Sequence, residues 1–136
     1  MLVVEDSDND AALIEMALRK TGFVNPFRMV GSPAEAIRYL EGAGKYGDRG
    51  KFPFPHLILL DNKMPGDGWV VIGWVRARPK LKSMRIVVFS GSDDPTHKHT
   101  ACEFGANDYY VKPQDFDEFT RAVRGIADAW LCGERG

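Results

Sequence analysis

The chain has 136 residues, of which 44% are hydrophobic and 27% are charged, and its formal net charge is −1 at pH 7. The length fits one domain covering residues 1–136, and a chain of this size buries roughly 70% of the surface that it exposes when unfolded. The near-zero charge argues against a general nucleic-acid surface, which requires a basic excess. There is no apolar run of membrane-spanning length and no signal peptide at the start, so we expect a cytoplasmic protein without membrane contact.

The first part of the chain alternates short apolar runs with helix-like segments. Leu2–Val4 predicts a short strand, and the spacing of apolar residues predicts a helix over Asp8–Lys20. A second strand is expected at Phe27–Val30. The segment Ser32–Glu35 has the pattern of a capping box with proline at the first helical position, so a second helix should begin there.

The middle of the chain combines a polar segment with two buried strands. Gly42–Pro55 is rich in glycine, charged residues and proline, and we expect a long surface loop that is too polar to be buried. Leu57–Leu60 and Ile86–Phe89 are continuous apolar runs, which are typical of strands in a sheet covered on both faces. A helix is predicted between them, over Trp69–Ala77.

The last part of the chain predicts two helices around one strand. Asp94 should cap a helix that ends at Gly105, and Tyr109–Val111 predicts the fifth strand. Asp115 should cap the final helix, whose apolar residues recur every three or four positions up to Trp130. Five strands and five helices in alternation predict an α/β fold, a flavodoxin-like (βα)5 doubly wound parallel sheet with strand order 2-1-3-4-5.

Polar residues follow four of the five predicted strands. Glu5 and Asp6 follow the first strand, Asp61 the third, Ser90 the fourth and Lys112 the fifth. The carboxyl ends of parallel strands meet at one edge of a sheet, where ligands bind in this class of fold. A single acid after a strand is more often a helix cap, but the joint pattern predicts one functional site.

The chemistry of these residue types suits phosphoryl transfer. Three clustered carboxylates should recruit Mg²⁺, which prefers oxygen ligands. Asp61 could then attack phosphorus as a nucleophile, while Lys112 supplies a second positive charge. The Ser90 hydroxyl can donate a hydrogen bond to a phosphoryl oxygen, and Gly91 leaves space for the incoming group.

The motifs at these strand ends resemble the receiver domain of bacterial response regulators. They are Glu5 with Asp6, Asp61 within LILLDNKMPGDG, Ser90 with Gly91, and the segment YYVKP that ends at Pro113. The resemblance covers nearly the whole chain. One departure is that the family usually has one more residue in the loop between MP and the following glycine. The polar segment at residues 42–55 and the ending DEFTRAVRGIADAWL are similar to the single-domain regulators that serve bacterial phytochromes.

The resemblance implies a phosphoacceptor and a metal site. Asp61 would accept the phosphoryl group. Mg²⁺ would be held by Glu5, Asp6 and Asp61 and by the backbone carbonyl of Lys63. The Lys63 side chain is either an ordinary solvent-exposed loop lysine or a residue that modulates dephosphorylation beside the site, since loops carry both roles.

The resemblance also implies how the group is bound and how the domain responds. Ser90, Gly91 and Lys112 would bind the phosphoryl group, and a cis peptide bond is expected at Lys112–Pro113. Ser90 and Tyr109 would form the switch pair. Phosphoryl oxygens should draw the Ser90 hydroxyl inward and let Tyr109 turn toward the interior.

The function implied is that of a single-domain response regulator without an output domain. It would accept its phosphoryl group from a sensor histidine kinase, such as a bacteriophytochrome, or from a histidine phosphotransfer protein. It would catalyse its own phosphotransfer and a slow autodephosphorylation without being a metabolic enzyme. The last helix and strand are expected to form a homodimer interface or to bind the kinase.

Three other functions remain open on the residues alone. A receiver-like module that is never phosphorylated is disfavoured because all acceptor-site residues are present. A metal-dependent phosphohydrolase usually needs an acid two residues after its aspartate, where this chain has Lys63. A flavodoxin needs a phosphate loop after the first strand, whereas the acids at Glu5 and Asp6 would repel a phosphate without a cation.

Overall fold

The computed structural model describes residues 1–20, 22, 27–61 and 67–131. The described part forms one five-stranded parallel sheet in the order β2-β1-β3-β4-β5, which confirms the predicted topology. The strands are β1 (Leu2–Val4), β2 (Arg28–Val30), β3 (Leu57–Leu60), β4 (Arg85–Ser90) and β5 (Asp108–Val111). The α-helices are α1 (Asp8–Lys20), α2 (Pro33–Glu41), α3 (Asp67–Arg76), α4 (Pro95–Phe104) and α5 (Phe116–Leu131). Two short 3-10 helices are η1 (Gly44–Gly47) and η2 (Pro79–Leu81).

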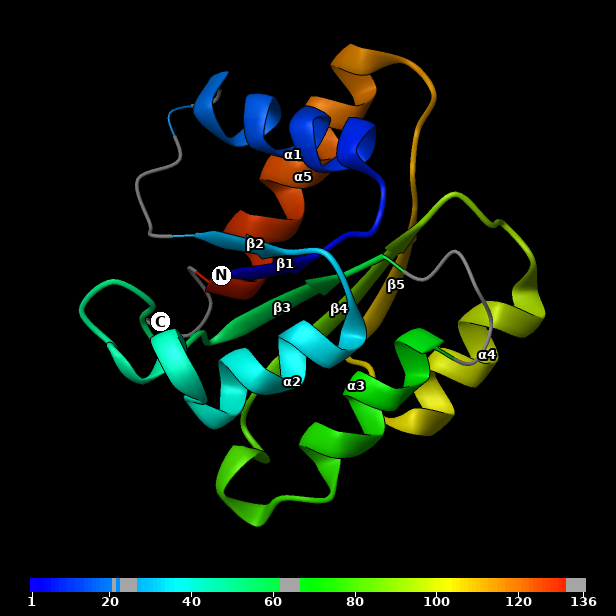
Figure 1. Cartoon of the computed structure of the whole chain (residues 1–136). Helices are drawn as coiled ribbons and strands as arrows, with labels where there is room; N and C mark the ends of the chain where they lie inside the picture. Colours follow the sequence, from blue (N-terminus) through cyan, green and yellow to red (C-terminus); the bar gives the residue numbers. More distant parts are fainter. Residues whose placement is uncertain (21, 23–26, 62–66, 132–136) are drawn as a thin grey trace.

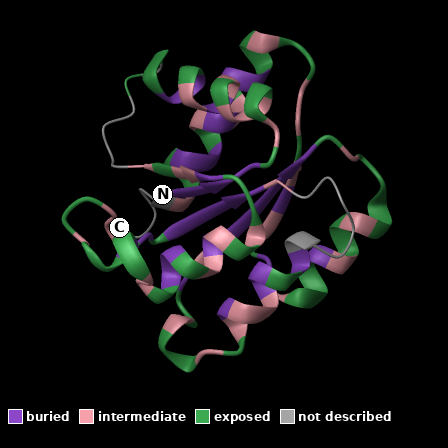
Figure 2. Ribbon diagram, viewed as in Figure 1, coloured by how far each residue is buried: buried purple, intermediate pink, exposed green. Residues whose placement is uncertain are grey.

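Helices cover both faces of the sheet, with α1 and α5 on one side and α2, α3 and α4 on the other (Figure 1). Successive residues of a strand point to opposite faces, so each strand contributes to two cores. In β3, Leu57 and Leu59 face the α1–α5 side, while Ile58 and Leu60 face the other side. All four are buried, which explains why the strand is a continuous apolar run (Figure 2).

The boundaries of α2 follow from its caps. The Ser32 hydroxyl accepts a hydrogen bond from the amide of Glu35 at 3.1 Å, which confirms the predicted N-terminal cap. The Glu35 carboxylate reaches back to the amide of Gly31 at 3.1 Å, one residue before the usual partner in a capping box. The helix ends at Gly42, whose φ of 71° lies in the left-handed region that favours glycine.

The prediction that residues 42–55 are too polar to be buried is wrong in one respect. The segment forms η1, and the ring of Tyr46 is buried against Tyr39 of α2 at a centroid distance of 4.9 Å. Phe52 packs on both rings at 6.0 and 5.0 Å. The charged residues around Tyr46 stay at the surface, so a polar segment still contributes an aromatic cluster to the core.

No helix in the described ranges combines the length and the apolar character needed to cross a membrane.

Candidate functional site

The sheet itself positions the polar residues that follow its strands. The amide of Asp61 donates to the carbonyl of Val4 at 2.9 Å, and the amide of Lys112 donates to the carbonyl of Ser90 at 2.7 Å. These bonds continue the parallel ladder by one residue beyond β3 and β5. The predicted convergence of the strand ends is therefore present in the structure, at the carboxyl edge of the sheet.

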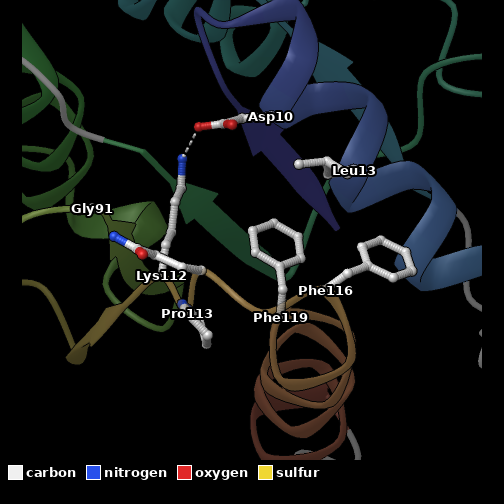
Figure 3. Close-up of a pocket in the computed structure, with 8 residues that line it drawn as sticks. Asp10, Leu13, Gly91, Lys112, Pro113, Phe116 and Phe119 are labelled. Carbon is white, nitrogen blue, oxygen red and sulfur yellow. Dashed lines mark hydrogen bonds and ion pairs between the residues drawn. The ribbon is translucent and has the colours of Figure 1, made fainter.

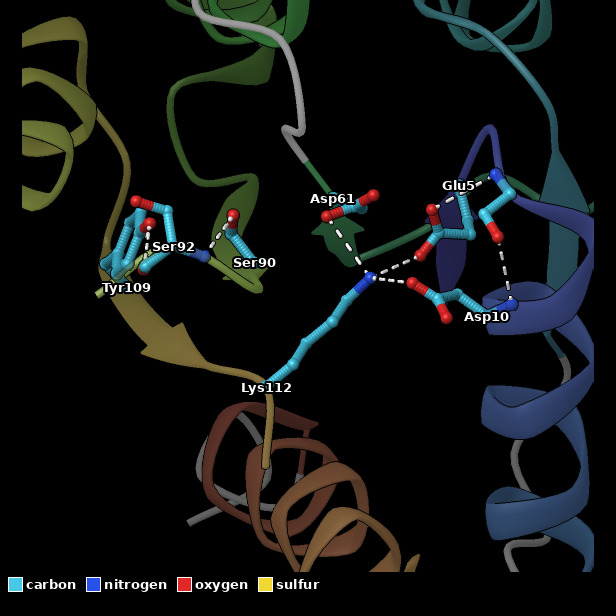
Figure 4. Close-up of polar contacts among 8 residues, drawn as sticks. Glu5, Asp10, Asp61, Ser90, Ser92, Tyr109 and Lys112 are labelled. Atoms are coloured by element: carbon cyan, nitrogen blue, oxygen red, sulfur yellow. Dashed lines mark hydrogen bonds and ion pairs between the residues drawn. The ribbon is translucent and has the colours of Figure 1, made fainter. Parts of the chain in front are cut away.

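The ammonium of Lys112 lies among three carboxylates (Figure 4). Its Nζ is 2.7 Å from Oε1 of Glu5, 2.7 Å from Oδ2 of Asp10 and 3.2 Å from Oδ1 of Asp61. The side chains of Lys112, Glu5 and Asp61 are only 8%, 0% and 2% exposed, whereas that of Asp10 is 23% exposed. The site is thus an acid-rich cluster that is closed on most sides around one cation.

Burial and neighbouring charges shift the pKa of two members of this cluster. Burial raises the pKa of Glu5 to about 8, and Asp61 adds to this effect while Lys112 opposes it. For Lys112, burial acts to lower the pKa, but the hydrogen bonds to Asp10 and Glu5 and the charge of Asp61 outweigh it and raise the pKa. Lys112 therefore stays charged near neutral pH, while the acids repel one another.

The residues present fit a hard divalent cation. Oxygen atoms of Glu5, Asp6 and Asp61 lie within 4.8 Å of one another. Both carboxylate oxygens of Asp61 are buried and accept no hydrogen bond from the described residues. A buried carboxylate without hydrogen bonds is costly unless a cation or a polar ligand completes it. All three donors are carboxylate oxygens, the ligands that Mg²⁺ and Mn²⁺ take.

Ser90 and Tyr109 are connected through Ser92. Ser90 is buried at the end of β4, and its hydroxyl oxygen accepts a hydrogen bond from the amide of Ser92 at 3.3 Å. The Tyr109 hydroxyl donates to the carbonyl of Ser92 at 2.7 Å. Tyr109 is already 7% exposed and packed in the core, whereas we expected its inward turn to follow phosphorylation. The hydrogen bond to Ser92 holds the ring inward without a phosphoryl group.

Gly91 lies at the edge of an open space beside Lys112 (Figure 3). An added Cβ at Gly91 would meet no atom within 4 Å. A pocket of about 440 Å³ runs from there between the N-terminal ends of α1 and α5, and its lining includes Asp10, Lys112 and Phe119. The space predicted beside Gly91 is thus present, and it extends past Lys112 toward α1.

One predicted feature is wrong, and another lies outside the described residues. No peptide bond among the described residues is cis, so Lys112–Pro113 is trans. The trans isomer is the intrinsically preferred one even before proline. The strand ladder that ends at the Lys112 amide and the Lys112 side chain contacts are both satisfied with this bond in trans. Lys63, whose carbonyl was expected to bind the metal, is outside the described residues.

Sequence reasoning missed Asp10. It placed this residue only within the first helix, yet its carboxylate makes one of the two shortest contacts to Lys112. The local pattern Ser-Asp-Asn-Asp points instead to a capping role, and the Asp10 amide does donate to the Ser7 hydroxyl at 3.3 Å. The partner of the carboxylate lies 102 residues later in the chain, so no local signal could reveal it.

Comparisons with known proteins agree with the geometry. The family model for the response regulator receiver domain matches residues 1–124. Among curated proteins, the chain is 29% identical over 132 residues to the response regulator Rcp1 of Synechocystis, covering 96% of this chain and 88% of Rcp1. A crystal structure of the Mn²⁺-bound form of Rcp1 superposes with a TM-score of 0.80.

Two further solved structures belong to light-signalling regulators. The response regulator RPA3017, from red light signalling of R. palustris, is 28% identical, with a TM-score of 0.88 and coverage of 96% of this chain and 92% of that one. The phosphorylated cyanobacterial phytochrome response regulator RcpA is 30% identical, with a TM-score of 0.84 and coverage of 96% and 91%. With the acid–lysine site at the strand ends and a family match over most of its length, this chain belongs to the response regulator receiver domain family.

Proposed function

We propose that this chain is a phosphorylation-dependent signalling switch in which Asp61 accepts a phosphoryl group. The observation that carries the proposal is the state of Asp61. Its carboxylate is buried beside the Lys112 ammonium, and both of its oxygens lack a hydrogen-bond donor among the described residues. A carboxylate held in this way is an available nucleophile with a cation already in place for the developing charge.

The donor would be a phosphohistidine of a sensor histidine kinase or of a histidine phosphotransfer protein. An Asp61 oxygen attacks phosphorus, the new O–P bond forms, and the P–N bond to the imidazole breaks. The imidazole nitrogen keeps the electron pair of that bond and takes up a proton. Bound Mg²⁺, held by Glu5, Asp6 and Asp61, would neutralise charge on the transferring group. Lys112 and the Ser90 hydroxyl bind the phosphoryl oxygens, with Gly91 leaving the approach open.

The domain itself would slowly hydrolyse the acyl phosphate. Water attacks the phosphorus, the O–P bond to Asp61 breaks, and inorganic phosphate leaves. In the phosphorylated state the Ser90 hydroxyl turns to the phosphoryl group. Ser92 donates to Ser90 and accepts from Tyr109, so this rotation disturbs the link that holds the Tyr109 ring. The β4–α4 segment and β5 are therefore the elements that sense the site.

The similarity to Rcp1, RcpA and RPA3017 supports a phytochrome-type sensor kinase as the cytoplasmic partner. A homodimer through β5 and α5 is supported by the surface next to the switch. Val111 at the end of β5 is 45% exposed, although it is a large apolar side chain. Light scattering with and without beryllofluoride tests whether dimerisation responds to activation, and a monomer mass in both conditions would refute the dimer.

Intact-protein mass spectrometry tests the acceptor. Treatment with acetyl phosphate and magnesium should add one phosphoryl group to the wild type, and hydroxylamine should remove it. Asp61→Asn should add none. Asp93→Asn, an exposed acid near the same edge of the sheet, is the matched control and should be phosphorylated like the wild type. Phosphorylation of Asp61→Asn at the wild-type level would refute the proposal.

A further inference from the structure

We infer that Asp10 is a positioning residue that holds the Lys112 ammonium toward α1 and competes for it with the phosphoryl group. The inference rests on the proposed phosphorylation of Asp61 and concerns how tightly the site binds the phosphoryl group. Asp10 is not one of the three acids that fit a metal, and its carboxylate meets the site at Lys112. It would act on the reaction through that lysine.

Lys112 has a limited number of hydrogen-bond donors. A lysine ammonium has three N–H donors. Two of them make short contacts of 2.7 Å, to Glu5 and Asp10, while the contact to Asp61 is longer at 3.2 Å. Figure 4 shows the ammonium between Asp61 on one side and Glu5 and Asp10 on the other. In this arrangement the ammonium lies closer to Glu5, which follows β1, and to Asp10 of α1 than to the acceptor.

A phosphoryl oxygen on Asp61 must take one of these donors. The third N–H remains on the Asp61 side, but two shorter bonds hold the ammonium 3.2 Å from Asp61, so it must shift away from Glu5 or Asp10 to bind a phosphoryl oxygen closely. The side chain of Glu5 is 0% exposed, so water cannot replace the lysine as its partner. Asp10 is 23% exposed, and water can replace the lysine there at much lower cost. Asp10 is therefore the acceptor that Lys112 leaves.

The structure gives both side chains room for this change. Asp10 and Lys112 line the same pocket of about 440 Å³, which lies beside their contact (Figure 3). Neither side chain is enclosed by packing on that side. The ammonium can turn toward Asp61, and the Asp10 carboxylate can be hydrated within the pocket. Lys112 must first leave the negatively charged Asp10 carboxylate. Asp10 therefore lowers the affinity of the site for a phosphoryl group.

Calorimetric titration of the full chain with beryllofluoride, at magnesium concentrations that saturate each variant, tests the inference. Asp10→Asn keeps the shape and an acceptor oxygen but removes the charge, and it should bind beryllofluoride about tenfold more tightly, which corresponds to ~1.4 kcal/mol. Asp10→Glu keeps the charge within reach of Lys112 and should stay near the wild type. Asp8→Asn removes the same charge from the same helical turn at an exposed position, and should also stay near the wild type.

Unchanged or weaker binding by Asp10→Asn would overturn the inference, as would equal tightening in Asp8→Asn, because a general charge effect would then explain both. The ¹⁵N signal of the Lys112 ammonium gives a second readout, since it should shift in Asp10→Asn and not in Asp8→Asn. An unshifted signal in both variants would also overturn the inference. If Asp10→Asn melts below the working temperature, Asp10→Ser replaces it. Failure of the wild type to bind beryllofluoride would instead refute phosphoryl acceptance at Asp61, and the inference with it.

Discussion

The cationic side chains of Lys112 and Arg49 each contact several partners, and the kinds of partner differ. Lys112 contacts three carboxylates, whose charges exceed its own. Arg49 donates to the backbone carbonyls of Tyr39, Leu40 and Phe52 at 3.0, 3.1 and 3.3 Å, and its guanidinium lies 5.7 Å from the centre of the Tyr39 ring. These partners of Arg49 are neutral and include two carbonyls from the last turn of α2, of which that of Tyr39 also accepts from the Gly42 amide at 3.1 Å.

The difference separates a structural site from a functional one. The planar guanidinium of Arg49 donates to neutral carbonyls and lies over ring faces. These contacts stabilise its charge and fix residues 42–55 to α2. Around Lys112, the acids outnumber the cation, and the oxygens of Asp61 have no donor among the described side chains and amides. Such a site gains stability from a further cation or a polar ligand, whereas the Arg49 site has little to gain from either.

The largest expected effect of a single change lies on the structural side. Tyr39 is 2% exposed, packs on Tyr46 and Phe52, and donates to the carbonyl of Pro53 at 2.9 Å. Tyr39→Ala should lower the free energy of unfolding by about 3–5 kcal/mol, measured by urea denaturation. Tyr39→Phe keeps the ring and should lose only about 1 kcal/mol. The stabilisation by magnesium should be unchanged in both, and a change in it would show that the two regions are coupled.

The acid cluster should make the metal-free protein sensitive to pH. Burial raises the pKa of Glu5 to about 8 from an ordinary value of 4.5, so the folded state retains a proton that the unfolded chain releases. Stability in EDTA should therefore fall as the pH rises from about 4.5 to about 8, by a few kcal/mol. Glu5→Gln should remove most of this dependence. Thermal melts across this pH range measure the dependence. An equally steep fall of stability in Glu5→Gln would assign the pH dependence to another group.

The forked geometry of Arg49 is the next test of the comparison. Arg49→Lys keeps the positive charge but cannot donate in parallel to the carbonyls of Tyr39 and Leu40. The free energy of unfolding should fall by about 1–2 kcal/mol. A lysine variant as stable as the wild type would mean that charge at the end of α2 suffices and that the hydrogen bonds contribute little.

The smallest expected effect is at the other end of α2. Ser32→Ala removes the hydroxyl that accepts from the amide of Glu35 and should lower the free energy of unfolding by about 1 kcal/mol. Ser32→Asp keeps an acceptor at the cap and should restore most of the loss. Equal losses in both variants would argue that the hydroxyl is not the stabilising group at this cap.

Much of the fold could be predicted because its signals are local. Buried strands such as Leu57–Leu60 are continuous apolar runs, and the polar residue that ends each run marks the edge where ligands bind. Glu5, Asp61 and Lys112 were identified by this rule, and the structure brings them together. The regular alternation of strands and helices restricts the topology to very few arrangements.

The rest depended on contacts that no local pattern encodes. Asp10 has the spacing of a helix cap, and its role appears only when the chain returns with Lys112. The burial of Tyr46 was missed because its neighbours are charged, and a short 3-10 helix was needed to turn its ring inward. The trans bond before Pro113 shows the limit of resemblance, since the expected cis bond was carried over from the family and not from any feature of this chain.

The backbone bonds that hold Asp61 and Lys112 also tie the site to the stability of the whole domain. Each amide is the last rung of a ladder: that of Asp61 bonds to Val4 between the central strands β3 and β1, and that of Lys112 bonds to Ser90 between the edge strand β5 and β4. Glu5 and Lys112, which meet at 2.7 Å, are 107 residues apart in the chain, so their contact closes only when both halves of the sheet have formed. The amide proton of Asp61, between two central strands, should then exchange with solvent only through global opening. A substitution that weakens a distant part of the core shortens the time for which an intact site exists at all.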